Sequence, residues 1–172
     1  MKRHRVPAEY RVIMVCLGNI CRSPAAEVVL RRKLELAHLD HVVVDSAGTG
    51  GWHVGDAADP RSQAAWELRG YTGDHRARQF RREWFDERDL VLVMDAQNHA
   101  TLQALARTEA QRSRIRYLRE FDPAQSSAGT SDPGQLEVPD PYYGGAQGFE
   151  HMLDLIERAC DGLIEALRNK SL

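Results

Sequence analysis

The sequence feature that most constrains the fold is a short apolar run that gives way abruptly to a loop of small and polar residues. Residues 12–15, Val-Ile-Met-Val, form the continuous apolar segment typical of a strand buried on both faces of a parallel sheet. Cys16 follows, and the loop after it reaches Pro24. We expect a helix over residues 24–37, with Ser23 as its N-cap and Pro24 at its first position. The segment therefore predicts a strand, a tight loop and a helix.

A loop in this position is suited to binding a tetrahedral anion. Its backbone N–H groups turn inward, and the N-terminus of the helix adds positive potential. Arg22 adds a planar guanidinium that can donate two hydrogen bonds to one phosphate. Cys16 would lie beneath the anion, where the same groups favour its thiolate and place it for attack on phosphorus. The predicted phosphate-binding residues are Leu17, Gly18, Asn19, Ile20, Cys21, Arg22 and Ser23.

Simpler interpretations of the loop are less specific. A lone cysteine at a strand end is most often a small buried hydrophobic residue. The loop also lacks the GxxxxGK[ST] and GxGxxG patterns of nucleotide-binding folds. Cys16 followed by five residues and then by Arg22 and Ser23 is a much more particular combination, and it favours a nucleophile beneath a phosphate.

The remainder of the chain alternates between strand and helix patterns. Strands are expected at residues 41–46, 90–94 and 114–118, and helices at residues 60–69, 96–106 and 147–167. Residues 121–139 are predicted to be an exposed irregular loop, and residues 46–51 a flexible turn. This alternation predicts an α/β fold, a single-domain doubly wound sheet of four parallel strands flanked by helices, with the phosphate loop after the first strand. Residues 1–10 are predicted to be a flexible basic tail, and residues 11–172 to form the folded domain.

Composition excludes several classes of protein. A net charge of −2 gives no support for nucleic-acid binding, and no apolar run approaches the ~18 residues of a membrane span. Three cysteines, Cys16, Cys21 and Cys160, do not resemble a disulfide framework, so we expect a cytoplasmic protein. The seven histidines are scattered, and His75 has no second ligand at a suitable spacing, so neither a metal nor another cofactor is expected.

Four segments together resemble the low-molecular-weight protein tyrosine phosphatase family. They read VCLGNICRSPAAE, DSAGTGGWHVGDAADPR, DHRARQF and VPDPYYGG. The resemblance runs from residue 11 to about residue 167. It implies metal-independent hydrolysis of protein phosphotyrosine and aryl phosphates through a cysteinyl-phosphate. Because members of the family are mostly monomers, a monomer is also expected. Phosphotyrosine proteins would be its substrates, and inorganic phosphate or similar oxyanions would bind the loop.

The resemblance assigns further roles. Asp140 lies between two prolines that restrict its backbone, and it matches the family's general acid, which becomes the base in the second step. Trp52 lies in a polar, glycine-flanked loop, and we expect it to wall the substrate cleft together with Tyr142 and Tyr143. The resemblance also favours supporting roles for two residues around Asn19: a hydrogen bond from Ser46 that holds Asn19, and a buried, hydrogen-bonded, structural His75.

Cys21 and Cys16 lie in one tight loop and are predicted to form a reversible disulfide after oxidation by peroxide, as in similar family members. The alternative is that Cys21 only packs. Cys160 is expected to be buried and inert.

Three other functions compete with phosphotyrosine hydrolysis. An arsenate reductase would need further cysteines, and none lies between Cys21 and Cys160. Phosphoarginine phosphatases resemble this sequence but tend to carry threonine where Ile20 stands. A silent phosphate-binding module would need neither Cys16 nor Asp140.

Overall fold

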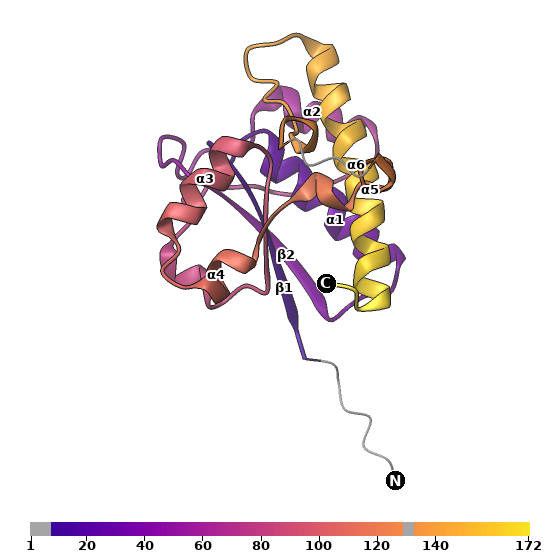
Figure 1. The fold of residues 1–172 in the computed structure, drawn as a ribbon. Coiled ribbons are helices and arrows are strands. Elements are labelled where there is room, and N and C mark those ends of the chain that lie inside the picture. Colours follow the sequence, from indigo (N-terminus) through magenta and orange to yellow (C-terminus); the bar gives the residue numbers. More distant parts are fainter. Residues whose placement is uncertain (1–7, 129–132) are drawn as a thin grey trace.

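The computed structural model describes residues 8–128 and 133–172, which form a parallel four-stranded sheet with helices on both faces (Figure 1). The strands are β1 (Tyr10–Cys16), β2 (Val42–Gly48), β3 (Leu90–Val93) and β4 (Ile115–Tyr117). Their order is β2-β1-β3-β4, so the chain winds from β1 to β2 in one direction and from β2 to β3 and β4 in the opposite direction. This doubly wound α/β arrangement confirms the predicted fold class.

The helices form a layer on each side of the sheet (Figure 1). Their bounds are α1 (Arg22–Leu36), α2 (Pro60–Leu68), α3 (Ala96–Leu105), α4 (Glu109–Ser113), α5 (Pro123–Ala128) and α6 (Ala146–Asn169). Short 3-10 helices are η1 (Arg82–Phe85), η2 (Leu118–Phe121) and η3 (Pro133–Leu136). Helices α1, α2 and α6 pack together over one face, whereas α3 and α4 lie over the other.

Strand β1 shows why a continuous apolar run predicts a central strand. Successive side chains point to opposite faces of a sheet. Val12 and Met14 accordingly belong to the core beneath α1 and α6, whereas Ile13 and Val15 belong to the core beneath α3. All four are fully buried, so this part of β1 has no face available to solvent.

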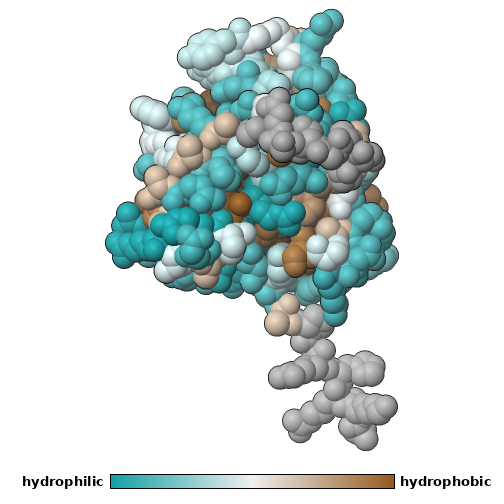
Figure 2. All heavy atoms as spheres, viewed as in Figure 1, coloured by the Kyte–Doolittle hydropathy of each residue, from teal (hydrophilic) through white to brown (hydrophobic). Residues whose placement is uncertain are grey.

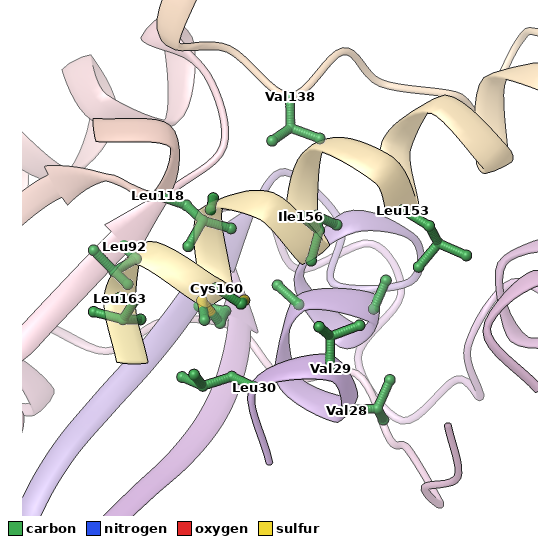
Figure 3. Close-up of a cluster of buried hydrophobic side chains, with 14 of the residues drawn as sticks. Val28, Val29, Leu30, Leu92, Leu118, Val138, Leu153, Ile156, Cys160 and Leu163 are labelled. Carbon is green, nitrogen blue, oxygen red and sulfur yellow. The ribbon is translucent and has the colours of Figure 1, made fainter. Parts of the chain in front are cut away.

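Helix α6 is the principal cover of the larger core (Figure 3). Its apolar side chains recur at the i, i+3, i+4 spacing predicted from the sequence and face α1. The α6 residues labelled in the close-up are Leu153, Ile156, Cys160 and Leu163, and the α1 residues are Val28, Val29 and Leu30. Burying one such aliphatic side chain contributes ~1.5–3 kcal/mol, so this contact fixes α6 and the loop before it against the sheet.

Helix α1 begins earlier than predicted. Its first residue is Arg22, its N-cap is Cys21, and Ser23 makes no capping hydrogen bond. The Oγ atom of Ser23 instead lies within hydrogen-bonding distance of Cys16 Sγ and accepts a hydrogen bond from Asn19 Nδ2. The prediction of a Ser23 cap was wrong because these partners in the phosphate loop engage the hydroxyl that a cap would use.

Strand β2 continues to Gly48, so the predicted flexible turn begins too early. The N–H of Gly48 donates to the carbonyl of Arg78, and the N–H of Phe80 donates to the carbonyl of Gly48. Parallel pairing with β1 continues to the Cys16–Gly48 pair and sets this end of β2, and the segment that includes Arg78 and Phe80 adds one further bridge at Gly48.

Other boundaries follow the sequence or depart from it locally. Asp59 caps α2, Pro60 occupies its first position, and Gly70 ends the segment with a φ of 86°, all as predicted. The predicted irregular loop at 121–139 contains α5 and η3, and residues 129–132 lie outside the described part of the chain. Residues 1–7 of the predicted tail also lie outside it, and Tyr10 is already the first residue of β1.

The face of the molecule drawn in Figure 2 is mainly hydrophilic, with small separated hydrophobic areas. Within the described residues, no helix has the length and apolar character needed to cross a membrane.

Candidate active site

The candidate site lies at the carboxyl ends of β1 and β3, where the winding direction of the sheet reverses. Ligands of doubly wound sheets bind at this switch point. Cys16 ends β1, and Asp95 follows β3. A cavity of about 310 Å³ opens here. Its lining residues are Cys16, Leu17, Gly18, Ile20, Cys21, Arg22, Trp52, His53, Asp140, Tyr142 and Tyr143.

Cys16 lies in the cavity wall with only 3% of its surface exposed. Its Sγ atom is 3.0 Å from Ser23 Oγ and accepts a hydrogen bond from the backbone N–H of Asn19 at 3.3 Å. Both partners lie in the segment that joins β1 to the first turn of α1. The Asn19 N–H therefore points at the sulfur, the Ser23 hydroxyl lies beside it, and the sulfur belongs to the cavity wall.

Asn19 fixes the shape of the loop. It has a left-handed φ of 57° and is fully buried. Its Nδ2 donates to Ser23 Oγ at 2.8 Å and to Ser46 Oγ at 3.0 Å, and its Oδ1 accepts from the N–H of Arg78 at 2.9 Å. His75 is half-buried and donates from Nε2 to the Asn19 carbonyl at 2.6 Å. The structure thus brings Ser46 and His75 onto Asn19.

The end of β2 forms a second wall of the loop. The Oγ atom of Ser46 donates to Glu27 Oε1 at 2.7 Å, which links β2 to α1. A Cβ atom at Gly48 would lie 2.7 Å from the carbonyl oxygen of Leu17, so only glycine allows this close approach. The N–H groups of Thr49 and Gly50 donate to the carbonyls of Cys16 and Leu17, both at 2.9 Å.

Arg22 connects the phosphate loop to the opposite side of the cavity. Its buried guanidinium donates to Asp95 Oδ2 at 2.6 Å and to the carbonyl of Val138 at 3.1 Å, and it lies 3.4 Å from Asp140 Oδ2. Burial by itself lowers the pKa of Arg22. The negative charge of Cys16 and the hydrogen bond to Asp95 outweigh burial and raise that pKa. Arg22 therefore stays charged in a nearly dry position.

Asp140 belongs to a more open part of the site. Its carboxyl is 42% exposed, and Oδ1 accepts a hydrogen bond from the N–H of Tyr142 at 3.1 Å. The rings of Tyr142 and Tyr143 meet edge to face with centroids 4.9 Å apart, and Tyr143 is 96% exposed. Both tyrosines line the cavity.

Trp52 lines the other side of the cavity entrance and is 74% exposed. Its ring folds back over Gly50, where a Cβ atom would lie 1.9 Å from the ring. His53 also lines the cavity, with Nδ1 3.2 Å from Asp56 Oδ2. The sequence analysis missed this contribution of His53, although it directly follows the predicted Trp52.

Two further cysteines differ in their position relative to the site. Cys21 lines the cavity, and its pKa is raised by burial first and then by the negative charges of Asp59, Cys16 and Asp140. Cys160 is enclosed in the α1–α6 core, where burial raises its pKa (Figure 3). All three cysteines, Cys16 included, are free thiols in this structure.

Some partners of the site residues had no predicted role. Asp95 holds Arg22 and also caps α3 through Asn98. The signal for Asp95 was present, because an acidic residue directly after β3 must lie near the end of β1 once the two strands are adjacent. No comparable signal identified Glu27. Among residues 8–128 and 133–172, no cluster of three or more potential metal-ligating side chains occurs.

The fold and the site together define a doubly wound α/β protein whose anion-binding loop carries a cysteine. Comparison with known proteins identifies the family. The model of the low molecular weight phosphotyrosine protein phosphatase family matches residues 11–172. A low molecular weight protein-tyrosine-phosphatase of Streptomyces coelicolor is 51% identical over 162 residues, which covers 94% of this chain and 95% of that protein.

Solved structures agree with these matches. The crystal structure of a protein tyrosine phosphatase from Entamoeba histolytica, with Hepes in its active site, superimposes with a TM-score of 0.86 at 36% identity, covering 95% of this chain and 100% of that chain. The YwlE arginine phosphatase from Geobacillus stearothermophilus gives a TM-score of 0.77 at 26% identity, and the match covers 94% of this chain and 95% of that chain. The chain belongs to the low-molecular-weight protein-tyrosine phosphatase family, so it is a phosphotyrosine-hydrolysing enzyme.

Proposed function

We propose that this phosphatase uses Cys16 as its nucleophile, Arg22 and the loop amides as its phosphate-binding groups, and Asp140 as its general acid and base. The observation that carries the proposal is the convergence of these three side chains on one cavity, with the Asn19 N–H directed at the sulfur, the Ser23 hydroxyl 3.0 Å from it and the Arg22 guanidinium 3.4 Å from Asp140.

In the first step, the Cys16 thiolate attacks phosphorus, the S–P bond forms, and the bond from phosphorus to the tyrosyl oxygen breaks. Asp140 gives its proton to the departing oxygen, because a phenolate with a conjugate-acid pKa of ~10 is a poor leaving group. A positioned acid contributes ~10²–10⁴-fold. Arg22 and the N–H groups of residues 17–23 stabilise the equatorial phosphoryl oxygens.

In the second step, a water molecule attacks the cysteinyl-phosphate, and the S–P bond breaks. Asp140, now ionised, accepts the proton of this water. The hydroxyl of Ser23, which lies 3.0 Å from the sulfur, donates a hydrogen bond to the departing thiolate. Arg22, the loop N–H groups, Asp140 and Ser23 stabilise the charges that develop on the phosphoryl oxygens, the leaving oxygen and the sulfur. The proposed steps therefore use no metal ion and no other cofactor.

The shape of the cavity supports a preference for phosphotyrosine. Cys16 is nearly buried below an entrance formed by Trp52, Tyr142 and Tyr143. An aryl phosphate spans this depth and places its ring between the aromatic side chains, whereas the shorter phosphoserine does not. Inorganic phosphate and similar oxyanions would bind the loop alone.

The proposal is tested by turnover of p-nitrophenyl phosphate and of a phosphotyrosine peptide in the presence of EDTA. We expect Cys16→Ser to abolish turnover and Asp140→Ala to slow it about 10²- to 10³-fold. Cys160→Ala is the matched control and should keep the wild-type rate, because Cys160 lies in the core away from the cavity. Turnover by the Cys16→Ser variant near the wild-type rate would end the cysteinyl-phosphate proposal. A phosphoarginine peptide, assayed in parallel, tests the alternative substrate.

We also propose that Cys16 and Cys21 form a disulfide that protects the enzyme from peroxide. Both thiols line the cavity, and each reaches solvent through it. Oxidation of Cys16 to the sulfenic acid, followed by attack of the Cys21 sulfur and loss of water, would link the two. Mass spectrometry after peroxide treatment should find the Cys16–Cys21 link. Overoxidised Cys16 without this link would contradict the proposal.

The remaining assignments are also proposals: a phosphatase domain that begins at residue 11, a monomeric state, a cytoplasmic location, and phosphotyrosine proteins as substrates rather than nucleic acid or membranes. The free thiols support a reducing compartment. Sedimentation analysis tests the oligomeric state, and a variant that lacks residues 1–7 and keeps wild-type activity would support the domain assignment.

A further inference from the structure

We propose that Arg61, at the start of α2, is a positioning residue that holds the loop carrying Asp140 over the phosphate loop. This inference rests on the proposed role of Asp140 as general acid. Arg61 does not line the cavity, but it contacts residues that belong to both sides of it.

The first contact ties Arg61 to the side of the phosphate loop. Its Nε and Nη2 atoms donate to the two carboxylate oxygens of Asp59 at 3.1 and 2.9 Å, and its backbone N–H donates to Asp59 Oδ1 at 2.9 Å. The carboxyl of Asp59 is nearly buried, and its own N–H donates to the carbonyl of Ile20 at 2.8 Å. The pair is therefore fixed to the loop that surrounds Cys16.

A second link strengthens this anchor. The hydroxyl of Ser62, the residue after Arg61, is buried and donates to the carbonyl of Cys21 at 3.0 Å. The first turn of α2 is thus hydrogen-bonded to two successive residues of the phosphate loop.

The opposite contacts of Arg61 reach the loop that carries Asp140. Its guanidinium carbon lies 5.4 Å from the centroid of the Tyr142 ring and 4.9 Å from that of Phe149, which is buried in α6. Both distances fall within the range of cation–π attraction. Tyr142 in turn donates its backbone N–H to Asp140 Oδ1. A continuous path therefore runs from the phosphate loop through Asp59, Arg61 and Tyr142 to the acid.

Asp140 needs such a path because little else holds it. Its side chain is 42% exposed, and its carboxyl oxygens accept a hydrogen bond from the Tyr142 N–H and approach Arg22 to 3.4 Å. Removing the Arg61 side chain would leave the phosphate loop with its own hydrogen bonds and would free Tyr142 to move. The expected loss lies in protonation of the leaving group and not in binding of phosphate.

The test compares kcat/KM for aryl phosphates whose leaving groups range from the weakly basic p-nitrophenolate to the strongly basic phenolate. We expect Arg61→Ala to reduce kcat/KM about tenfold for phenyl phosphate, part of the ~10²–10⁴-fold that a positioned acid supplies, and about twofold for p-nitrophenyl phosphate. The dependence on leaving-group basicity should become steeper, and the inhibition constant of inorganic phosphate should stay within about twofold. Arg61→Lys, which keeps the cation but not the fork on Asp59, should recover part of the loss.

Arg69→Ala is the matched control. Arg69 follows the other end of α2 and binds Glu150 and Glu157 of α6, each at 2.6 Å, without a contact to residues 138–145 among its described hydrogen bonds and ion pairs. If loss of contacts between α2 and α6 were sufficient to impair the acid, Arg69→Ala would show the same steeper dependence of kcat/KM on leaving-group basicity. We expect its leaving-group dependence to equal that of the wild type, and equal slopes for the two variants would overturn the inference.

A double variant separates failure of this inference from failure of the proposed mechanism. In an Asp140→Ala background, Arg61→Ala should cause no further loss for phenyl phosphate, because the acid that it positions is gone. If Asp140→Ala alone leaves the rate and its leaving-group dependence unchanged, the proposed acid is wrong. If Asp140→Ala steepens that dependence and Arg61→Ala does not, only the positioning role is wrong.

Discussion

The two sides of the cavity differ in how firmly the chain holds them. On the phosphate-loop side, Cys16, Asn19 and Ser23 are buried and joined to β2 and to the segment after residue 74 by short hydrogen bonds. On the acid side, Asp140 is largely exposed, and Tyr143 is almost wholly so. The proposed nucleophile lies in a hydrogen-bonded frame, whereas the proposed acid is carried by a surface loop.

This difference follows from what each side must do. Phosphate binding depends on amides that already point at the anion before it arrives, since reorganising them during the reaction would reduce the stabilisation. The acid side must admit an aromatic ring and release a product, so it cannot be sealed. Arg22 spans the two sides, because it is buried like the loop and also faces Asp140.

The largest effect that would sharpen this comparison is expected at Arg22. Arg22→Lys keeps the charge but loses the planar fork that binds Asp95, Val138 and an incoming phosphate. We expect kcat/KM for p-nitrophenyl phosphate to fall about 10²- to 10³-fold, as for loss of one preorganised transition-state contact. Arg32→Lys, on the exposed side of α1, should have no effect. A loss of less than about threefold at Arg22 would show that charge alone suffices.

The next effect concerns stability and contrasts the two sides directly. Asn19→Ala removes hydrogen bonds to Ser23, Ser46 and the Arg78 N–H and places alanine at a left-handed φ. We expect the free energy of unfolding to fall by about 3 kcal/mol, since each buried group left unpaired costs ~1–3 kcal/mol. Asp140→Ala should change it by less than about 0.5 kcal/mol. Equal losses in urea denaturation would break the comparison between a rigid and an open side.

A smaller effect is expected from alkaline pH, which reports on buried thiols. Burial raises the pKa of the Cys160 and Cys21 thiols in the folded state. Below the pKa of ~8.5 that these thiols have in the unfolded chain, both states keep the protons, and the stability of the fold is at its full value. Above that pH the unfolded chain loses these protons first, and stability falls by about 1.4 kcal/mol per pH unit for each thiol. Between about pH 9 and 10, the free energy of unfolding of the Cys160→Ala variant should fall less steeply than that of the wild type, by about 1.4 kcal/mol per pH unit. An unchanged slope in denaturation curves across this range would contradict the assignment.

Tyr71 would extend this decline at still higher pH. Its burial, with the nearby charge of Glu157, raises its pKa to about 12, so it also resists ionisation while folded. Near pH 9, Tyr71→Phe should change the free energy of unfolding only through loss of the hydrogen bond between the Tyr71 hydroxyl and Glu157. Above the ordinary tyrosine pKa of ~10, the substitution should make the decline of stability with pH shallower, as measured by denaturation at each pH.

The smallest effect is expected at Trp52, on the exposed rim. Its ring is largely in solvent, so Trp52→Ala should change the free energy of unfolding by less than about 0.5 kcal/mol. The loss of one aromatic contact with the substrate ring should lower kcat/KM for a phosphotyrosine peptide about fivefold. Inhibition by inorganic phosphate should be unaffected. A change in phosphate inhibition would show that the rim and the phosphate loop are coupled.

The sequence predicted the class of fold because apolar periodicity and helix punctuation are local signals. The run in β1, the Asp59–Pro60 start and Gly70 end of α2, and the apolar face of α6 are all confirmed. The predicted ends of strands and helices were wrong where contacts with distant parts of the chain determine them. Pairing with β1 carries β2 to Gly48, and the hydroxyl of Ser23 contacts Cys16 and Asn19 in the loop instead of capping the helix.

By itself, the sequence determined the sheet, the loop and the residue types that phosphate chemistry needs, since a strand, a tight turn and a helix start are encoded by neighbours along the chain. Only the tertiary structure decided that Asp95 would hold Arg22, that Glu27 would hold Ser46, and that Arg61 would stand between the phosphate loop and Tyr142. These contacts join residues far apart in the chain. Their distances depend on how strands and helices pack, and no local pattern of residues encodes that packing.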